Sequence, residues 1–160
     1  MIDPFSHHPN LRSFIKPSKD SFFRTITTEQ VKEMLANSGL PLTLEFYDDE
    51  TRETLRRKAL ANHKGDLLIF AYGSLIWDPA LEFSGIRHAF APKHQRRFIL
   101  VDTHGGRGTA EAPGLMAALD NGKGCEGFAF KISAEKVETE TEILFRREMI
   151  APGYHARFIT

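Results

Sequence analysis

The chain has 160 residues, of which 41% are hydrophobic and 26% are charged, as in an ordinary globular domain. Its 21 Lys and Arg residues balance 21 Asp and Glu residues, and this argues against nucleic acid as a partner, since phosphate binding depends on an excess of basic side chains. The single cysteine, Cys125, excludes an intramolecular disulfide and any zinc site built from several cysteines.

The sequence suggests neither a membrane helix nor a secretory signal. No segment reaches the roughly 20 apolar residues that a membrane-spanning helix needs. The first residues lack the basic region and the apolar stretch of a signal peptide. We therefore expect no membrane association and a cytoplasmic, reducing location.

Residues 1–65 are expected to form an irregular arm followed by helices. Residues 1–25 contain three prolines and little periodicity, which is typical of irregular structure. Thr27 and Gln30 have the spacing of a capping box, which predicts a short helix ending at Gly39.

A second helix is predicted over residues 49–63, with Gly65 just past its end. Leu55 and Ala59 share one face of this helix. The helix also carries a basic cluster that we interpret as a solvated surface: Arg52, Arg56, Arg57 and Lys58.

From residue 66 the pattern changes to strands. Short apolar or alternating segments, separated by turns rich in Gly and Pro, predict strands at 67–71, 97–101, 115–119, 126–132 and 154–160. A helix over residues 134–149, with Ser133 as its N-cap, is predicted after the fourth strand. Together these elements predict an α+β fold whose sheet curls toward a small barrel.

One carboxylate of the 134–149 helix is notable for its position. At about 100° per residue, Val137, Thr141 and Leu144 fall within one narrow sector, and Glu148 falls in the middle of it. Because an unpaired buried carboxylate is costly, Glu148 should either have a partner or act chemically. Desolvation would suit it to be a general base. The alternative is that Glu148 turns out to water or pairs with an arginine.

Two loops containing glycine are candidate ligand sites. In residues 71–77, Gly73 allows a ligand to approach the backbone, Ser74 adds a hydroxyl, and consecutive amides can bind an anion. This spacing fits neither a P-loop nor a dinucleotide motif, and an ordinary turn is the alternative. Residues 105–114 hold four glycines and a proline, too many for a packed element. Arg107 in this loop could orient a substrate carboxylate or tie the loop to the domain.

Other chemical motifs are missing from the sequence. The histidines show no HExxH pattern, so we predict no metal site. Ser74 does not lie in a GxSxG elbow, and Cys125 is expected to be buried and inert. The sequence thus suggests no nucleophile of its own.

Three blocks, taken together and in this order, resemble the ChaC-like gamma-glutamylcyclotransferases, most closely the bacterial branch. They are IFAYGSLIWDP at 69–79, GRGT with PG at 106–114, and REM with GY at 147–154. The resemblance covers about residues 67–158. It implies a small mixed β-barrel with flanking helices over residues 66–160, preceded by a helical N-terminal extension over residues 1–65.

The resemblance also implies an activity and a site. Enzymes of this family release 5-oxoproline and Cys-Gly from glutathione without a metal or organic cofactor. The family's essential glutamate corresponds to Glu148, and its substrate loop corresponds to Ala71, Tyr72, Gly73, Ser74, Leu75 and Ile76; Arg107 is a weaker candidate. The expected function is a glutathione-specific gamma-glutamylcyclotransferase with Glu148 as general acid and base. The alternative is a noncatalytic regulator of cation transport that binds a γ-glutamyl compound.

The sequence departs from the family at two places. Position 71 is alanine where glycine is common, and this would strain the loop if the site required a positive φ. Family members continue through further strands and helices beyond the point that matches Thr160. We therefore expect a domain that is incomplete at its C-terminus, with the 154–160 strand as an exposed edge. Such a fragment could also fold only as an oligomer.

Overall fold

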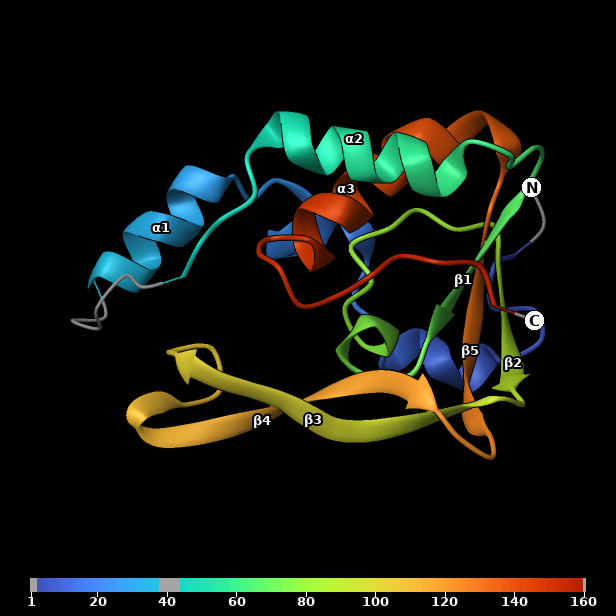
Figure 1. Cartoon of the computed structure of the whole chain (residues 1–160). Helices are drawn as coiled ribbons and strands as arrows, with labels where there is room; N and C mark the ends of the chain where they lie inside the picture. The colour runs from blue at the N-terminus through green and yellow to red at the C-terminus, as the bar shows by residue number, and fades with distance from the viewer. Residues whose placement is uncertain (1–2, 38–43, 160) are drawn as a thin grey trace.

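The computed structural model describes residues 3–37 and 44–159 and combines helices with two antiparallel sheets (Figure 1). Helices α2 and α3 lie side by side along one edge of the molecule, and the β3–β4 hairpin runs along the opposite edge. The helices are α1 (Thr28–Asn37), α2 (Asp49–Leu60) and α3 (Val137–Glu148). The strands are β1 (Leu67–Ala71), β2 (Gly85–Ala91), β3 (His94–His104), β4 (Thr109–Asn121) and β5 (Cys125–Ile132).

The strands form a three-stranded sheet of order β1-β5-β2 and a separate two-stranded sheet, β3-β4. Ile69 of β1 and Ile86 of β2 flank Phe130 of β5, and Phe130 and Ile86 have no exposed surface. The α+β class is therefore confirmed. Within the described ranges the two sheets do not close into one barrel.

The strand predictions need two corrections: one predicted strand does not form, and one strand was missed. Residues 154–159 form no strand; the hydroxyl of Tyr154 instead donates to the carbonyl of Ala117 at 3.0 Å, so a side chain rather than a backbone ladder joins this segment to β4. Strand β2 was not predicted, because only Ile86 and Ala91 of its residues are buried and the apolar pattern is weak. Pairing with β5 determines its structure.

The core lies between the three-stranded sheet and α3. The alternation predicted in β5 is confirmed, since Phe130 and Ile132 are buried while Lys131 is exposed. Apolar residues from the arm, the sheet, residues 76–81 and the helix complete the core: Ile15, Leu67, Ile69, Ile76, Leu81, Ile86 and Ile143. The core thus holds the end of β1 and the face of α3 in one packed unit.

Local signals placed the helix starts well. The capping box is confirmed, since the Thr27 amide donates to Gln30 Oε1 at 2.9 Å and the Gln30 amide donates to Thr27 Oγ1 at 3.2 Å. The expected stop at Gly39 lies outside the described residues. The helix predicted over 134–149 begins as the 3₁₀ turn η5 (Ala134–Lys136), where Asp66 rather than the Ser133 side chain accepts the Ala134 amide at 2.9 Å.

The basic cluster on α2 is a solvated surface only in part: Arg57 and Lys58 are exposed as expected, but Arg52 and Arg56 are buried. Arg52 and Arg56 are only 5% and 3% exposed. Arg52 donates to Thr28 Oγ1 at 2.7 Å, and Arg56 donates to Thr141 Oγ1 of α3 at 3.0 Å. Because these partners lie far away in the sequence, the charge pattern of α2 alone could not reveal them.

The N-terminal arm contains short 3₁₀ helices that pack along the sheet: η1 (Pro9–Ser13), η2 (Ser18–Asp20) and η3 (Phe22–Arg24). Near its start, the Pro4 carbonyl accepts the Ile86 amide of the edge strand β2 at 3.1 Å. His8 Nε2 accepts the next outward amide, that of His88, at 3.1 Å. The arm therefore occupies the backbone groups of a sheet edge that would otherwise be free to pair.

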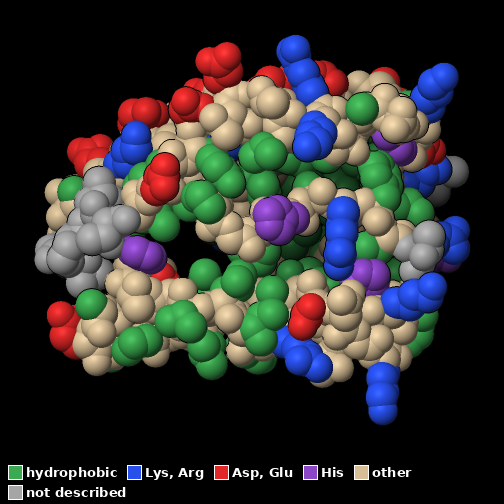
Figure 2. Space-filling view, in the orientation of Figure 1, with side chains coloured by type: hydrophobic (Ala, Val, Ile, Leu, Met, Phe, Trp, Pro, Cys, Tyr) green, Lys and Arg blue, Asp and Glu red, His purple; other side chains and the backbone are tan. Residues whose placement is uncertain are grey.

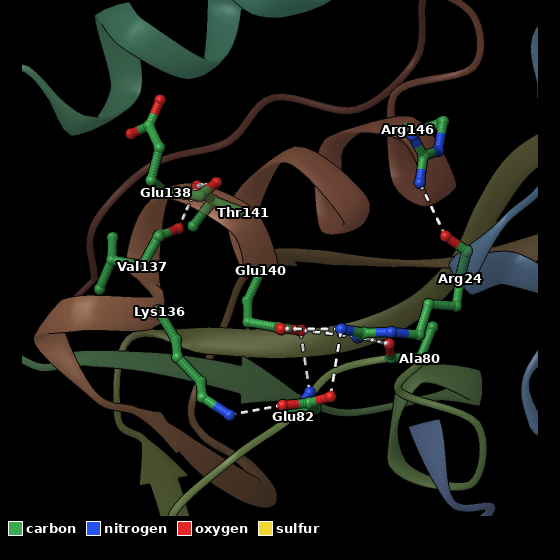
Figure 3. A network of polar contacts seen from close by, with 9 residues as sticks. All are labelled: Arg24, Ala80, Glu82, Lys136, Val137, Glu138, Glu140, Thr141 and Arg146. Carbon is green, nitrogen blue, oxygen red and sulfur yellow. Dashed lines mark hydrogen bonds and ion pairs between the residues drawn. The ribbon is translucent and has the colours of Figure 1, made fainter. Parts of the chain in front are cut away.

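A buried ion pair joins the arm to α3 (Figure 3). The Arg24 guanidinium of η3 donates to both Glu140 carboxylate oxygens, at 2.9 and 3.0 Å, and also to the Ala80 carbonyl at 2.8 Å. The Glu82 amide donates to the same carboxylate at 2.9 Å. Glu140 is 1% exposed, and its partners satisfy both of its oxygens. This network joins α3 to residues that lie far from it in the sequence.

Candidate active site

Strand β1 delivers the first candidate loop without strain. Ala71 is the last residue of β1, is 1% exposed and pairs with Phe128 of β5. Among the described residues, the non-glycine residue with a positive φ is Ala80, at 61°, and not Ala71. The alanine at position 71 therefore adopts ordinary strand geometry, and the strain that a positive φ would cause does not arise.

The loop after β1 turns tightly into the 3₁₀ helix η4 (Ser74–Ile76). The Ile76 amide donates to the Gly73 carbonyl at 3.0 Å, and the Asp78 amide donates to the Ser74 carbonyl at 3.2 Å. A Cβ atom built on Gly73 would meet no atom within 4 Å. The backbone at Gly73 therefore faces open space, as close approach by a ligand requires.

Two tyrosines connect this loop with the hairpin. Burial raises the pKa of the Tyr72 hydroxyl, and the nearby Tyr154 raises it further. Tyr154 contacts the Ala117 carbonyl of β4, and the Tyr72 carbonyl accepts from Arg96 of β3 at 3.1 Å. The loop, the hairpin and the segment after α3 thus meet around these two rings. Figure 2 shows the surface hollowed between the helical layer and the hairpin, with hydrophobic side chains around the hollow.

The second glycine-rich segment is mostly strand. Thr109 to Gly114 belong to β4: Thr109 pairs with His104 and Gly114 pairs with Asp102 of β3, and residues 110–113 lie between them at a register shift. The composition alone is typical of a loop. The turn that remains is organised by Asp102, which is 5% exposed and was not predicted. Its carboxylate accepts the amides of His104 at 2.9 Å and Gly108 at 3.1 Å, and also that of Arg107. Burial opposes ionisation of Asp102, but the three amides outweigh it and lower the pKa.

The position of Arg107 supports both roles that the sequence allows. Its backbone amide is tied to Asp102, and its positive charge opposes the effect of burial on the pKa of Tyr154. The Arg107 guanidinium therefore acts on the same tyrosine that contacts β4 beside the first loop. This places Arg107 on the hairpin side of the candidate site.

Glu148 ends α3 and is less buried than its helical sector predicts. Its side chain is 37% exposed and forms an ion pair with Arg147. The buried residues of α3 are Glu140, Thr141, Ile143, Phe145 and Arg147. A single narrow stripe was the wrong prediction, because α3 contacts both α2 and η3, and residues on several of its faces are buried. The fully buried carboxylate is Glu140, and that carboxylate is paired with Arg24.

Arg147 joins Glu148 to the loop side of the site. Its side chain is 4% exposed and contacts the Glu148 carboxylate. Burial lowers the pKa of the Arg147 guanidinium, and the negative charge of Asp78 opposes this effect. Since Asp78 follows η4, its charge brings the end of α3 into electrostatic contact with the glycine loop. Neither Asp78 nor Tyr154 was singled out by sequence reasoning as a site residue, and only their places in the matching blocks could have marked them.

The described residues contain neither a metal centre nor a membrane-spanning helix. Residues 3–37 and 44–159 bring together no cluster of three or more His, Cys, Asp or Glu side chains suited to a metal ion. In the same ranges no helix is long and apolar enough to cross a membrane. Cys125 is buried at the start of β5 and forms no disulfide.

Comparison with known proteins identifies the family to which residues 67–160 are similar. A family model described as ChaC-like protein matches residues 67–160. The glutathione-specific gamma-glutamylcyclotransferase of Escherichia coli strain K12 is 43% identical over 91 residues, which are 57% of this chain and 39% of that protein. The human glutathione-specific gamma-glutamylcyclotransferase 1 is 35% identical over 96 residues, 59% of this chain and 43% of the human protein.

A more distant relative shows the same pattern. The glutathione-specific gamma-glutamylcyclotransferase of Schizosaccharomyces pombe is 32% identical over 112 residues, or 60% of this chain and 53% of that protein. The chain thus spans about half the length, or less, of these curated relatives. Because the family model covers β1 through the segment after α3, both the glycine loop and Glu148 lie inside the match. The chain belongs to the ChaC-like family.

Proposed function

We propose that this chain carries the active site of a glutathione-specific gamma-glutamylcyclotransferase. The observation that carries the proposal is the arrangement of Glu148, Arg147 and Asp78, which couples a half-exposed carboxylate at the end of α3 to the glycine loop after β1. The names of the relatives, each a glutathione-specific gamma-glutamylcyclotransferase, supply the substrate class. Glutathione is then a small-molecule substrate that reaches the site from the open side of Gly73.

The reaction needs no nucleophile from the protein. In a γ-glutamyl compound the α-amine and the γ-carbonyl carbon belong to one molecule, and their bond closes a five-membered ring. The bond between the γ-carbon and the cysteine nitrogen breaks, and the products are 5-oxoproline and Cys-Gly. Folding the substrate into a near-attack geometry lowers the barrier, because the entropy of bringing the reacting atoms together is lost on binding.

Glu148 supplies the proton transfers in this proposal. The α-ammonium cannot attack while it is charged, so Glu148 takes one of its protons and later passes a proton to the departing cysteine nitrogen. The amides of Gly73, Ser74 and Leu75, which make no hydrogen bond to the described part of the chain, would hold the glutamyl end or the developing oxyanion. Tyr72 would line the loop, Ile76 packs in the core beneath it, and Arg107 would approach the substrate from the hairpin.

The fold supports this proposal at the level of architecture. We propose that residues 66–160 form the gamma-glutamylcyclotransferase-like unit, with the two antiparallel sheets as parts of the family's small barrel. Residues 1–65 would be an extension that packs on this unit through Arg24 and Glu140. The cytoplasmic location, and the absence of nucleic acid and membrane partners, stay predictions from the sequence.

The direct test is turnover of glutathione. Purified chain incubated with millimolar glutathione should release 5-oxoproline and Cys-Gly in equal amounts, measured by mass spectrometry. A noncatalytic γ-glutamyl-binding regulator would instead bind glutathione in a calorimetric titration and release neither product. Absence of both products from a well-folded chain would contradict the proposed activity on glutathione.

The glycine loop gives a second prediction. Gly73→Val should weaken substrate binding and raise KM about tenfold or more, because the new side chain would occupy the space that a ligand needs. The fold should tolerate the first added atom, since no atom lies within 4 Å of a Cβ at this position. Steady-state kinetics together with a thermal melt would separate the two effects.

The matched control for that variant is Gly65→Ala, in the exposed turn after α2. A Cβ at Gly65 also meets no atom within 4 Å, although its φ of +82° adds backbone strain. Gly65→Ala should therefore lower the melting temperature slightly and leave KM unchanged. An unchanged KM in Gly73→Val would mean that the substrate does not approach this loop.

A further inference from the structure

Arg147 is a buried cation with an incomplete set of partners. Its side chain is 4% exposed, and its guanidinium carbon lies 4.7 Å from the centre of the Phe23 ring. One terminal nitrogen contacts the Glu148 carboxylate. The Nε atom is buried and forms no hydrogen bond within the described residues. Burying an incompletely bonded cation is costly, so a role beyond packing is expected.

Asp78 carries the matching opposite charge. Its Oδ1 atom is buried and has no hydrogen-bond partner among the described residues, while Oδ2 lies 3.0 Å from Lys16 Nζ. The charge of Asp78 acts on Arg147, where it counteracts the effect of burial on the guanidinium pKa. A buried cation and a partly buried carboxylate therefore interact, and each keeps one polar atom unsatisfied.

The neighbouring arginine shows what a structural contact looks like at this helix end. Arg146 donates to the backbone carbonyl of Arg24 at 2.7 Å and lies 3.8 Å from the Glu142 carboxylate, so it joins α3 to the arm, although its Nε atom is also buried without a partner among the described residues. Arg147 differs in its surroundings, because its guanidinium contacts the Glu148 carboxylate while the charge of Asp78 acts on it. Packing on Phe23 accounts for the position of the guanidinium plane, but not for these charge contacts.

We infer that Arg147 is a positioning residue, which holds Glu148 ionised and oriented toward the glycine loop while Asp78 holds Arg147. This inference rests on the proposed function, in which Glu148 is the base. A base must be ionised before it can accept a proton from the α-ammonium, and a cation in contact favours the ionised form. Asp78 sets the geometry relative to the loop, because its amide donates to the Ser74 carbonyl.

The charged groups around Glu148 determine the direction in which its pKa should change in each variant. In the described residues they are Arg147 in direct contact, then Asp78 and Lys16 through Arg147. Removing the Arg147 charge should raise the pKa of Glu148, because the cation in contact favours the ionised form. Removing the Asp78 charge should raise the pKa of Glu148 by less, because Arg147 would no longer be held beside the carboxylate.

The experiment follows Glu148 directly in the full chain. Carboxyl ¹³C NMR, assigned with Glu148→Gln, gives the titration midpoint in wild type and in Arg147→Met, Arg147→Lys and Asp78→Asn. Arg147→Met should raise the midpoint, Arg147→Lys should restore most of the wild-type value, and Asp78→Asn should raise the midpoint by less than Arg147→Met does. In the turnover assay, Arg147→Met should shift the acidic limb of the pH profile of kcat to higher pH. It should also reduce kcat about tenfold, with a smaller change in KM.

Arg146→Met is the matched control, and it should leave the Glu148 midpoint unchanged. A Glu148 midpoint that is the same in wild type and Arg147→Met would overturn the inference. If Arg147→Met does not fold, Asp78→Asn decides, and an unmoved midpoint in that variant overturns the inference equally. The NMR titration needs no turnover, so failure of the proposed activity would be seen separately, as absence of 5-oxoproline from the wild type.

Discussion

Glu148→Gln should reduce turnover of glutathione by about 10²–10⁴-fold, the range that general acid–base catalysis contributes. Glutamine keeps the shape of the side chain but cannot take a proton from the α-ammonium. Because the Glu148 side chain is 37% exposed and pairs only at the helix end, the melting temperature should stay within a few degrees. Production of 5-oxoproline, followed by mass spectrometry alongside a thermal melt, measures both quantities.

Glu142→Gln is the matched control on the same helix. Its carboxylate is 65% exposed and lies 3.8 Å from Arg146, so this surface pair contributes little to stability or to the site. Turnover by Glu142→Gln should equal that of the wild type. If Glu148→Gln retained comparable activity, Glu148 would not be the base, and another group would have to move the proton.

The largest expected loss of stability comes from Glu140→Gln. The change removes the buried negative partner of Arg24 and leaves its guanidinium with the more exposed Glu82 carboxylate, which lies 3.4 Å away (Figure 3). Breaking a buried ion pair on one side costs about 3–5 kcal/mol of unfolding free energy. For a chain of this size that loss corresponds to a fall in melting temperature of roughly 10 °C. Urea unfolding followed by circular dichroism measures the free energy directly.

Asp3→Asn provides the matched control for a paired carboxylate. The Asp3 and Arg12 side chains are 48% and 58% exposed, so water screens their attraction. The melting temperature of Asp3→Asn should equal that of the wild type within error. Equal unfolding curves for Glu140→Gln and Asp3→Asn would show that the Arg24 network does not stabilise α3.

The elements that the sequence predicted correctly are those whose signals are local. The apolar run of β1 and the alternation in β5 come from burial of one strand face, and the capping box of α1 uses residues only three apart. Such patterns need no knowledge of distant partners. The segment from Thr109 to Gly114 shows the opposite case, because pairing of its two ends with β3 makes it part of a strand despite a composition typical of loops.

Long-range partners account for the errors. Arg56 is buried because Thr141 and Glu138 lie on another helix, and Glu140 is buried because Arg24 comes from the arm. A helical projection describes one element at a time, so it identified Glu148 by its angle and missed the carboxylate that the fold buries. Glu148 nevertheless stays the candidate base, because it contacts Arg147 and lies inside the family match.

Only part of the candidate site could be predicted, because some of its residues also depend on long-range partners. The loop from Ala71 to Ile76 follows directly from a strand and its glycine, so its position could be read from the chain. Asp102 could not, because its role depends on amides that the hairpin brings to it. Tyr154 could have been marked only by its place in the third matching block, and its contact with the Ala117 carbonyl appears only in the structure.

The contact between Arg24 and Glu140 also bears on the order in which the molecule folds, since 116 positions separate the two residues. Closing so long a loop costs chain entropy before any bond forms. The hairpin, whose strands are neighbours in the sequence, can form early, whereas α3 can dock onto η3 only after nearly the whole chain has collapsed. The candidate base therefore reaches its final position in one of the last steps of folding.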